Sequence, residues 1–117
     1  MGESFPEESR GPTDEPGPGT VARDTVSTAS EERRVKIVNR MGLHARPASE
    51  FVKLAGKFDS EIQVEKDGMT VNGKSIMGVL MLAAEQGSEL LIRGEGADAR
   101  EAVDALAALV GRGFDGG

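Results

Sequence analysis

The fold is decided by the stretch Glu61-Ile62-Gln63-Val64-Glu65-Lys66-Asp67-Gly68-Met69-Thr70-Val71-Asn72. Ile62 and Val64 alternate with polar residues, which is the pattern of a strand with one buried face. Asp67-Gly68 predicts a two-residue hairpin turn, and residues 69–72 are expected to form the returning strand. Strands joined by so short a turn run antiparallel, so this stretch predicts a sheet built around a hairpin.

The residues before the hairpin show first a strand pattern and then a helix pattern. Val35 and Ile37 alternate with basic residues, which predicts a strand from about Arg33. A helix is expected next, with Pro47 in its first turn and its end near Gly56. Its apolar stripe comprises Ala48, Phe51, Val52 and Ala55.

After the hairpin the sequence predicts a helix, a strand and a last helix. Ser75 can cap a short helix from Ile76 to about Ala84. Residues 90–92 form an apolar strand between glycines, and Asp98 with Glu101 fits a capping arrangement for the last helix. The stripe of that helix comprises Ala99, Ala102, Val103, Leu106, Leu109 and Val110, and it should stop near Gly111.

The predicted element order is β-α-β-β-α-β-α. One tight hairpin, with helices between the other strands, favours an α+β fold with an antiparallel or mixed sheet and its helices on one face. A domain of about 85 residues buries roughly 60–65% of its extended surface, which is enough for one stable core.

Acidic residues are concentrated at the N-terminus. Residues 1–32 hold eight acids against two arginines, whereas residues 33–117 hold twelve acids and twelve bases. Four of the five prolines lie within the first eighteen residues. Such a segment has little apolar surface to bury, so we expect residues 1–31 to be a disordered, acidic, Pro/Gly-rich extension and residues 32–115 to form one domain.

The composition argues against several classes of function. The chain has no cysteine and one histidine, which excludes disulfides and disfavours zinc. A neutral domain without Trp or Tyr lacks the basic, aromatic surface of a nucleic-acid-binding protein. No apolar run is long enough for a signal peptide or a membrane span, so we expect a soluble cytoplasmic protein that needs no metal and binds neither nucleic acid nor membrane.

His44 lies in Gly42-Leu43-His44-Ala45-Arg46-Pro47-Ala48, directly before the first predicted helix. The N–H groups of a first helical turn lack partners within the helix and attract anions. Leu43 can anchor the loop in the core while His44 points outward, and a neutral imidazole is nucleophilic. His44 could be merely an indifferent helix cap, but its surroundings favour a group that attacks a phosphoryl donor and carries the phosphoryl group.

Arg46 is the natural partner of an anion on His44. Its guanidinium offers a planar fork of donors to phosphate oxygens. A solvated surface charge is the simpler interpretation, but a cation in the first turn is disfavoured by the helix dipole. This placement against local preference suggests that Arg46 has a functional role.

Residues 68–75 match the P-loop pattern G-x-x-x-x-G-K-[ST] letter for letter. Gly68 belongs to the hairpin turn and residues 69–71 to a strand, so this segment does not read as a phosphate-cradling loop. The next strand leads into Arg93 and not into a magnesium-binding Asp. We interpret the match as accidental, and a small NTPase as an alternative that a test of ATP binding would exclude.

Ser75 and the helix after it admit two interpretations each. A serine caps a helix well, for about 1 kcal/mol, but it could also be phosphorylated there. Chemistry alone favours the cap. The following helix is apolar around most of its circumference, so we expect part of it to pack in the core and part to dock partners, with Ile76, Met77 and Leu80 on the exposed side.

Two separate motifs resemble the HPr family, the histidine-containing phosphocarrier proteins of the bacterial phosphoenolpyruvate phosphotransferase system. The first is residues 42–48, and the second is Asn72-Gly73-Lys74-Ser75-Ile76-Met77-Gly78-Val79-Leu80. The similarity spans about residues 33–115. It implies an open-faced β-sandwich, a four-stranded antiparallel sheet covered by three helices.

The resemblance also implies a function. His44 would take a phosphoryl group on Nδ1 from phosphorylated enzyme I and give it to enzyme IIA domains, with Arg46 attending the transfer. Ser75 matches the serine that an ATP-dependent HPr kinase phosphorylates in some bacteria, which favours phosphorylation over a simple cap. Partners would dock on the second helix and the start of the first. We expect a monomeric carrier, without a cofactor, rather than a complete enzyme.

Two features depart from the family pattern. The extension at residues 1–31 has no counterpart in it. The C-terminal Gly113-Phe114-Asp115 is more similar to the nitrogen-related branch, whereas the segment around Ser75 is more similar to the kinase-regulated sugar branch. The alternatives are therefore a nitrogen-branch phosphocarrier, or a regulatory adaptor whose output is Ser75 phosphorylation and docking to a transcription factor or kinase.

Overall fold

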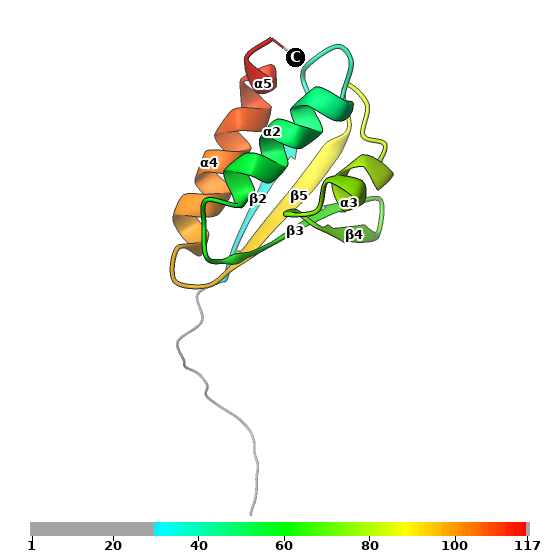
Figure 1. Cartoon of the computed structure of the whole chain (residues 1–117). Helices are drawn as coiled ribbons and strands as arrows, with labels where there is room; N and C mark the ends of the chain where they lie inside the picture. Colours follow the sequence, from blue (N-terminus) through cyan, green and yellow to red (C-terminus); the bar gives the residue numbers. More distant parts are fainter. Residues whose placement is uncertain (1–29, 117) are drawn as a thin grey trace, which may run out of the picture.

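The structure is a computed structural model, and it describes residues 30–116 (Figure 1). Its elements follow in the order β2 (Ser30–Lys36), α2 (Ala45–Ala55), β3 (Glu61–Lys66), β4 (Met69–Asn72), α3 (Ile76–Met81), β5 (Glu89–Glu95), α4 (Ala99–Gly111) and α5 (Gly113–Gly116). None of the helices in this part of the chain is long and apolar enough to span a bilayer.

The hairpin of residues 61–72 forms as predicted. β3 and β4 pair antiparallel, with Lys66 opposite Met69. Asp67 and Gly68 have φ values of 51° and 84°, and positive φ at both turn residues is what a type I′ hairpin requires. β5 pairs antiparallel with β3 and with β2, so the strand order is β2-β5-β3-β4.

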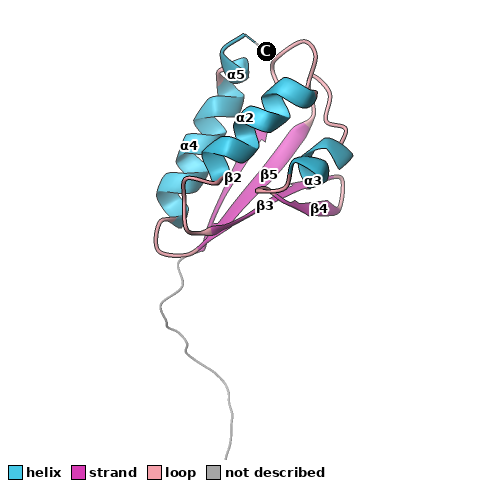
Figure 2. Ribbon diagram, in the orientation of Figure 1, coloured by secondary structure: helices cyan, strands magenta, loops and turns pink. Residues whose placement is uncertain are grey.

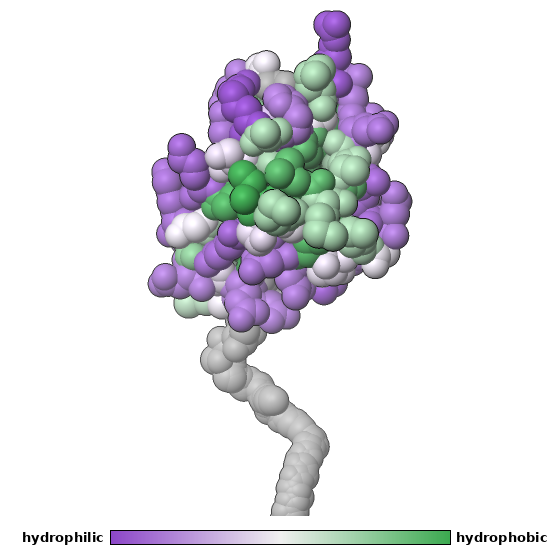
Figure 3. Space-filling view, turned by 45° about the vertical axis from the view of Figure 1, so that its right-hand side comes forward, coloured by the Kyte–Doolittle hydropathy of each residue, from purple (hydrophilic) through white to green (hydrophobic). Residues whose placement is uncertain are grey.

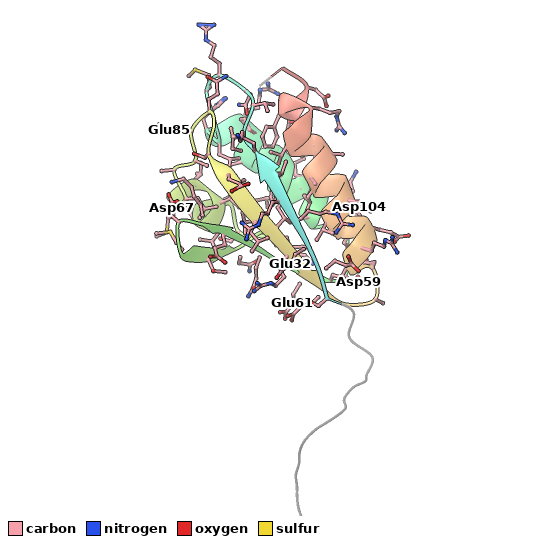
Figure 4. The ribbon with its side chains drawn as sticks, turned by 180° about the vertical axis from the view of Figure 1, so that it is seen from behind. Glu32, Asp59, Glu61, Asp67, Glu85 and Asp104 are labelled. Atoms are coloured by element: carbon pink, nitrogen blue, oxygen red, sulfur yellow. The ribbon has the colours of Figure 1, made fainter. Side chains whose placement is uncertain are left out.

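Helices α2, α3 and α4 cover one face of this antiparallel sheet (Figure 2). The core between the layers joins strand residues such as Ile92, which is fully buried, to Phe51 of α2 and Leu106 of α4. The opposite face has no helix on it and carries polar side chains such as Glu32, which pairs with Arg93 of β5 at 2.7 Å (Figure 4). The expected α+β open-faced sandwich is confirmed.

The first strand begins earlier than expected. Ser30 and Glu31 pair with Glu95 and Gly94 of β5, so two residues assigned to the N-terminal extension belong to the sheet. The apolar pattern starts only at Val35, and backbone pairing to a neighbouring strand leaves no trace in that pattern. Residues 1–29, and with them the interpretation of the extension as disordered, lie outside the described residues.

The helix after Ser75 is shorter than predicted. It ends at Met81 and not near Ala84, because Ala83 adopts a left-handed conformation with φ of 49°. Leu82 and Ala84 are buried even though they follow the helix. These two apolar side chains therefore anchor in the core the segment that leads from α3 to β5.

α4 has the predicted stripe, and all six of its apolar residues are buried. Asp98 is the N-cap residue of α4, as predicted, but its side chain makes no cap hydrogen bond to the helix. Its carboxylate instead accepts hydrogen bonds from the Ser60 hydroxyl and from the backbone N–H groups of Asp59 and Ser60, the latter two at 2.9 Å. These bonds hold the pKa of Asp98 below its ordinary value, and the bond from the Ser60 hydroxyl has the largest effect.

A short turn, α5, follows α4 and was not predicted. Phe114 and Asp115 both have φ of 55°, and the Phe114 side chain is fully buried against the core. A phenylalanine in a glycine-rich C-terminus gives no periodic pattern from which this turn could be recognised.

Candidate functional site

The loop that presents His44 is held tightly from behind. Leu43 is buried, and its N–H donates to the carbonyl oxygen of Ala84 at 2.8 Å. Gly42 has φ of 70°, and a Cβ at this position would lie 2.5 Å from the same oxygen. Only glycine allows the loop to approach the segment after α3 this closely.

Asn39 closes the loop from the other side, and sequence reasoning missed it. Its Nδ2 donates to the carbonyl oxygen of Gly42 at 2.8 Å, and the Gly42 N–H donates back to the Asn39 carbonyl oxygen at 3.2 Å. The side chain is buried. An asparagine three residues before a glycine is a recognisable turn pattern, so a signal was present.

His44 is the N-cap residue of α2. Its backbone is extended, with φ of −80° and ψ of −171°, and its carbonyl oxygen accepts the Ala48 N–H at 3.0 Å. Its side chain makes no capping hydrogen bond to the helix. The half-buried imidazole therefore sits at the positive end of α2.

Arg46 lies in the first turn of α2, as predicted, but its guanidinium is paired within the helix. Nη1 of Arg46 lies 2.7 Å from Oε2 of Glu50, which is one turn further along. Pro47 follows Arg46 in the first turn, where its missing N–H leaves no gap in the helix bonding. Glu50 was not among the predicted site residues, although its i,i+4 spacing from Arg46 can be read from the sequence.

Ser75 is the N-cap of α3, and its hydroxyl accepts the Gly78 N–H at 3.1 Å, so the predicted cap is confirmed. Lys74 before it donates from Nζ to the Phe58 carbonyl oxygen at 2.6 Å. A Cβ on Gly73 would lie 2.5 Å from the Ile62 side chain. The glycine and lysine of the P-loop-like segment thus serve packing against β3 and the α2–β3 loop.

The exposed side of α3 differs in part from the prediction. Ile76 and Met77 are exposed, at 39% and 68%, as expected. Leu80 is half-buried against the core, so its expected place on the exposed side is wrong. Met81, one turn after Met77, is exposed at 64% and takes that place. We call Ile76, Met77 and Met81 the α3 patch.

The α3 patch and the His44 loop lie on neighbouring parts of the molecule. The Leu43–Ala84 hydrogen bond joins the loop to the segment that leaves α3. Apolar side chains gather on the face that carries α3, with hydrophilic side chains around them (Figure 3).

The segment after α3 and the start of β2 lie at opposite ends of the sheet. Glu85 in that segment lies at the opposite end of the sheet from Glu61 (Figure 4). Glu61 and the first residue of β2 both pair with Glu95, so Glu61 lies at the end of the sheet where β2 begins. The loop therefore lies far from the point where residues 1–29 join the domain.

Residues 31–112 match the family model described as the PTS HPr component phosphorylation site. The chain belongs to the HPr family. The phosphocarrier protein HPr of Cupriavidus necator is 44% identical over 86 residues, which is 74% of this chain and 97% of that protein. The phosphocarrier protein NPr of Proteus mirabilis is 41% identical over 87 residues, again 74% and 97% of the two chains.

Solved structures of HPr-family proteins are similar to the described domain. HPr of Thermoanaerobacter tengcongensis superposes with a TM-score of 0.71 at 47% identity, covering 73% of this chain and 96% of that one. Crh of Bacillus subtilis, a catabolite repression protein solved as a swapped, intertwined dimer, has a TM-score of 0.59 at 44% identity, covering 68% and 91%. The fold and the phosphotransferase-system family of the chain are therefore established together.

Within residues 30–116, no three or more His, Cys, Asp or Glu side chains are grouped so that they could hold a metal ion.

Proposed function

We propose that this protein accepts a phosphoryl group on His44 from phosphorylated enzyme I and passes it to enzyme IIA domains. The observation that carries the proposal is the place of His44 in the HPr-family match, as the N-cap residue at the positive end of α2.

The transfer needs few groups. A neutral ring nitrogen, Nδ1 by the family resemblance, attacks the phosphorus of the donor, and the N–P bond forms as the bond from phosphorus to the donor breaks. The donor leaves with that bond's electron pair. The positive end of α2 stabilises the phosphoryl oxygens by about 0.3–1 kcal/mol per charge, up to about 2 kcal/mol when partly buried. That is enough to hold the group without trapping it.

The α3 patch is the proposed docking surface for both partners. It consists of exposed apolar side chains on α3, which is joined to the His44 loop through Ala84. Methionine makes adaptable contacts, which suits a carrier that must fit a donor and an acceptor in turn. Enzyme I and IIA domains are the partners that the family implies.

Ser75 is proposed as a regulatory phosphorylation site. A phosphate there would add about −1.5 to −2 charges directly beside the exposed Ile76 and Met77. Charge beside an apolar interface disfavours docking through desolvation. Phosphorylation would therefore slow phosphoryl transfer through His44 without altering the imidazole.

The experiment is phosphorylation of the full chain by phosphoenolpyruvate and enzyme I. We expect acid-labile, alkali-stable phosphate on the wild-type protein and none on His44→Ala, with Ser75→Ala still labelled. Label on His44→Ala would show that another residue carries the phosphoryl group. A screen of the cell's IIA domains as acceptors then separates the sugar branch from the nitrogen branch.

A regulatory adaptor is the second candidate. The similarity to Crh of Bacillus subtilis, a catabolite repression protein, favours it. This alternative predicts ATP-dependent labelling by a kinase that is lost in Ser75→Ala, and it is compatible with carriage on His44. The expected monomer is tested in the same preparations by light scattering, since the swapped Crh dimer shows another arrangement open to this fold.

A further inference from the structure

Arg46 and Glu50 form an ion pair on the surface of α2. Nη1 of Arg46 and Oε2 of Glu50 are 2.7 Å apart, and the side chains are 55% and 36% exposed. Residues four apart lie on the same side of a helix, one turn from each other. Glu50 therefore engages the guanidinium that the family resemblance assigns to phosphoryl transfer at His44.

The pairing holds the Arg46 guanidinium on the side of α2. Side chains on a helix lean toward its N-terminus, which here is the His44 end, so Glu50 leans toward Arg46 from one turn further along the helix. The guanidinium must leave Glu50, or share it, before it can meet a phosphate at the N-terminus.

Glu50 keeps cationic neighbours if Arg46 leaves. It lines a hollow of about 280 Å³ between α2 and α4, together with the cationic residues Lys53, Lys57 and Arg112 and the apolar residues Leu54 and Leu109. The carboxylate is also partly solvated. Separating the pair therefore leaves no buried, uncompensated charge, and an exposed i,i+4 pair contributes only about 0.3–0.5 kcal/mol.

We propose that Glu50 is a positioning residue that pairs with Arg46 in the unphosphorylated protein and thereby shifts the phosphoryl-exchange equilibrium away from the phosphorylated carrier. The proposal rests on the phosphocarrier function of His44. Arg46 has two alternative partners, the Glu50 carboxylate before phosphorylation and the phosphoryl oxygens after it. When the phosphoryl group departs, Glu50 takes the guanidinium back, and this favours release to the acceptor.

Direct repulsion between Glu50 and the phosphate is the competing explanation. Glu50 lies six residues beyond His44, which is about 9 Å along the helix axis. That is close to the screening length of about 8 Å at physiological ionic strength. The main effect of Glu50 should therefore pass through Arg46, and the two routes are separable by experiment.

The test is the equilibrium of phosphoryl exchange between enzyme I and the full-length carrier. Glu50→Gln should shift this equilibrium toward the phosphorylated carrier by about 1.7- to 2.3-fold, the amount that corresponds to one exposed i,i+4 ion pair. In an Arg46→Ala background, Glu50→Gln should shift it by less than about 1.3-fold, because no guanidinium remains to be released. Glu101→Gln, the same chemical change on the exposed surface of α4, is the matched control and should shift nothing.

A second measurement does not depend on transfer. The side-chain Nε–H resonance of Arg46 should move on phosphorylation of the wild-type protein and should differ in unphosphorylated Glu50→Gln. An unchanged equilibrium in Glu50→Gln overturns the proposal, as does an equal shift with and without Arg46, which would assign the effect to direct repulsion. Absence of any phosphorylation of wild-type protein would instead refute the carrier function itself.

Discussion

Replacing Gly42 with alanine should damage the fold and the site together. Gly42 has φ of 70°, and its missing Cβ would lie 2.5 Å from the Ala84 carbonyl oxygen and 2.9 Å from the Glu85 Cα. Both obstacles are backbone atoms, which cannot rotate aside as a side chain can. The loop carrying His44 would have to move away from the segment that follows α3.

Gly68 provides a matched control for the size of this effect. It has φ of 84°, but a Cβ there would meet no atom within 4 Å. Gly68→Ala therefore incurs only the strain of a left-handed non-glycine residue, about 1 kcal/mol or slightly more. Gly42→Ala incurs the same strain plus about 1–3 kcal/mol of overpacking, for a total of about 2–4 kcal/mol.

Urea unfolding followed by circular dichroism measures the difference. With a slope of about 1–2 kcal/mol per molar urea, the midpoint of Gly42→Ala should lie about 1 M below that of Gly68→Ala. Phosphorylation by enzyme I should be slowed in Gly42→Ala and unchanged in Gly68→Ala, measured where both are folded. Equal midpoints for the two variants would refute the close contact between the His44 loop and Ala84.

Three further predictions concern other parts of the domain. Asp98→Asn should destabilise the protein near neutral pH. Because hydrogen bonding lowers the pKa of Asp98 in the folded state, the difference in the free energy of unfolding between variant and wild type should shrink as the pH falls below about 4. Unfolding measured across this pH range tests the prediction. Leu106→Ala removes a fully buried side chain and should cost about 2–5 kcal/mol by the same urea assay; a loss below 1 kcal/mol would contradict its place in the core. Met77→Asp should leave stability within about 0.5 kcal/mol yet lower the rate of transfer from enzyme I at least fivefold, and an unchanged rate would remove Met77 from the docking surface.

Local patterns predicted much of this fold because they repeat at the spacing of one element. Ile62 and Val64 alternate and lie buried on one face of β3, and the stripe of α4 is buried throughout. The Asp67-Gly68 turn was equally predictable from the sequence, because few residues tolerate two successive positive φ values. The strand order β2-β5-β3-β4, by contrast, was not predicted and comes from the structure alone.

The candidate site was predicted in part. His44 and Ser75 were correctly placed at helix starts, because their flanking residues set those boundaries. The partner of Asp98 was missed, since Ser60 lies 38 residues away along the chain and either role suits an aspartate before a helix. Leu80 was expected on the exposed side of α3, where Met81 lies instead, because both are apolar and only packing decides which one faces the core.

The sequence by itself determined where His44 stands on its helix, since capping and proline preferences act over four or five neighbouring residues. The i,i+4 spacing of Arg46 and Glu50, which the sequence shows, also allows their ion pair. Only the tertiary structure brought the His44 loop against Ala84 and α3, over a separation of some forty residues. Contacts of that kind depend on the order in which strands join the sheet and on the close packing of the layers, which no local pattern encodes.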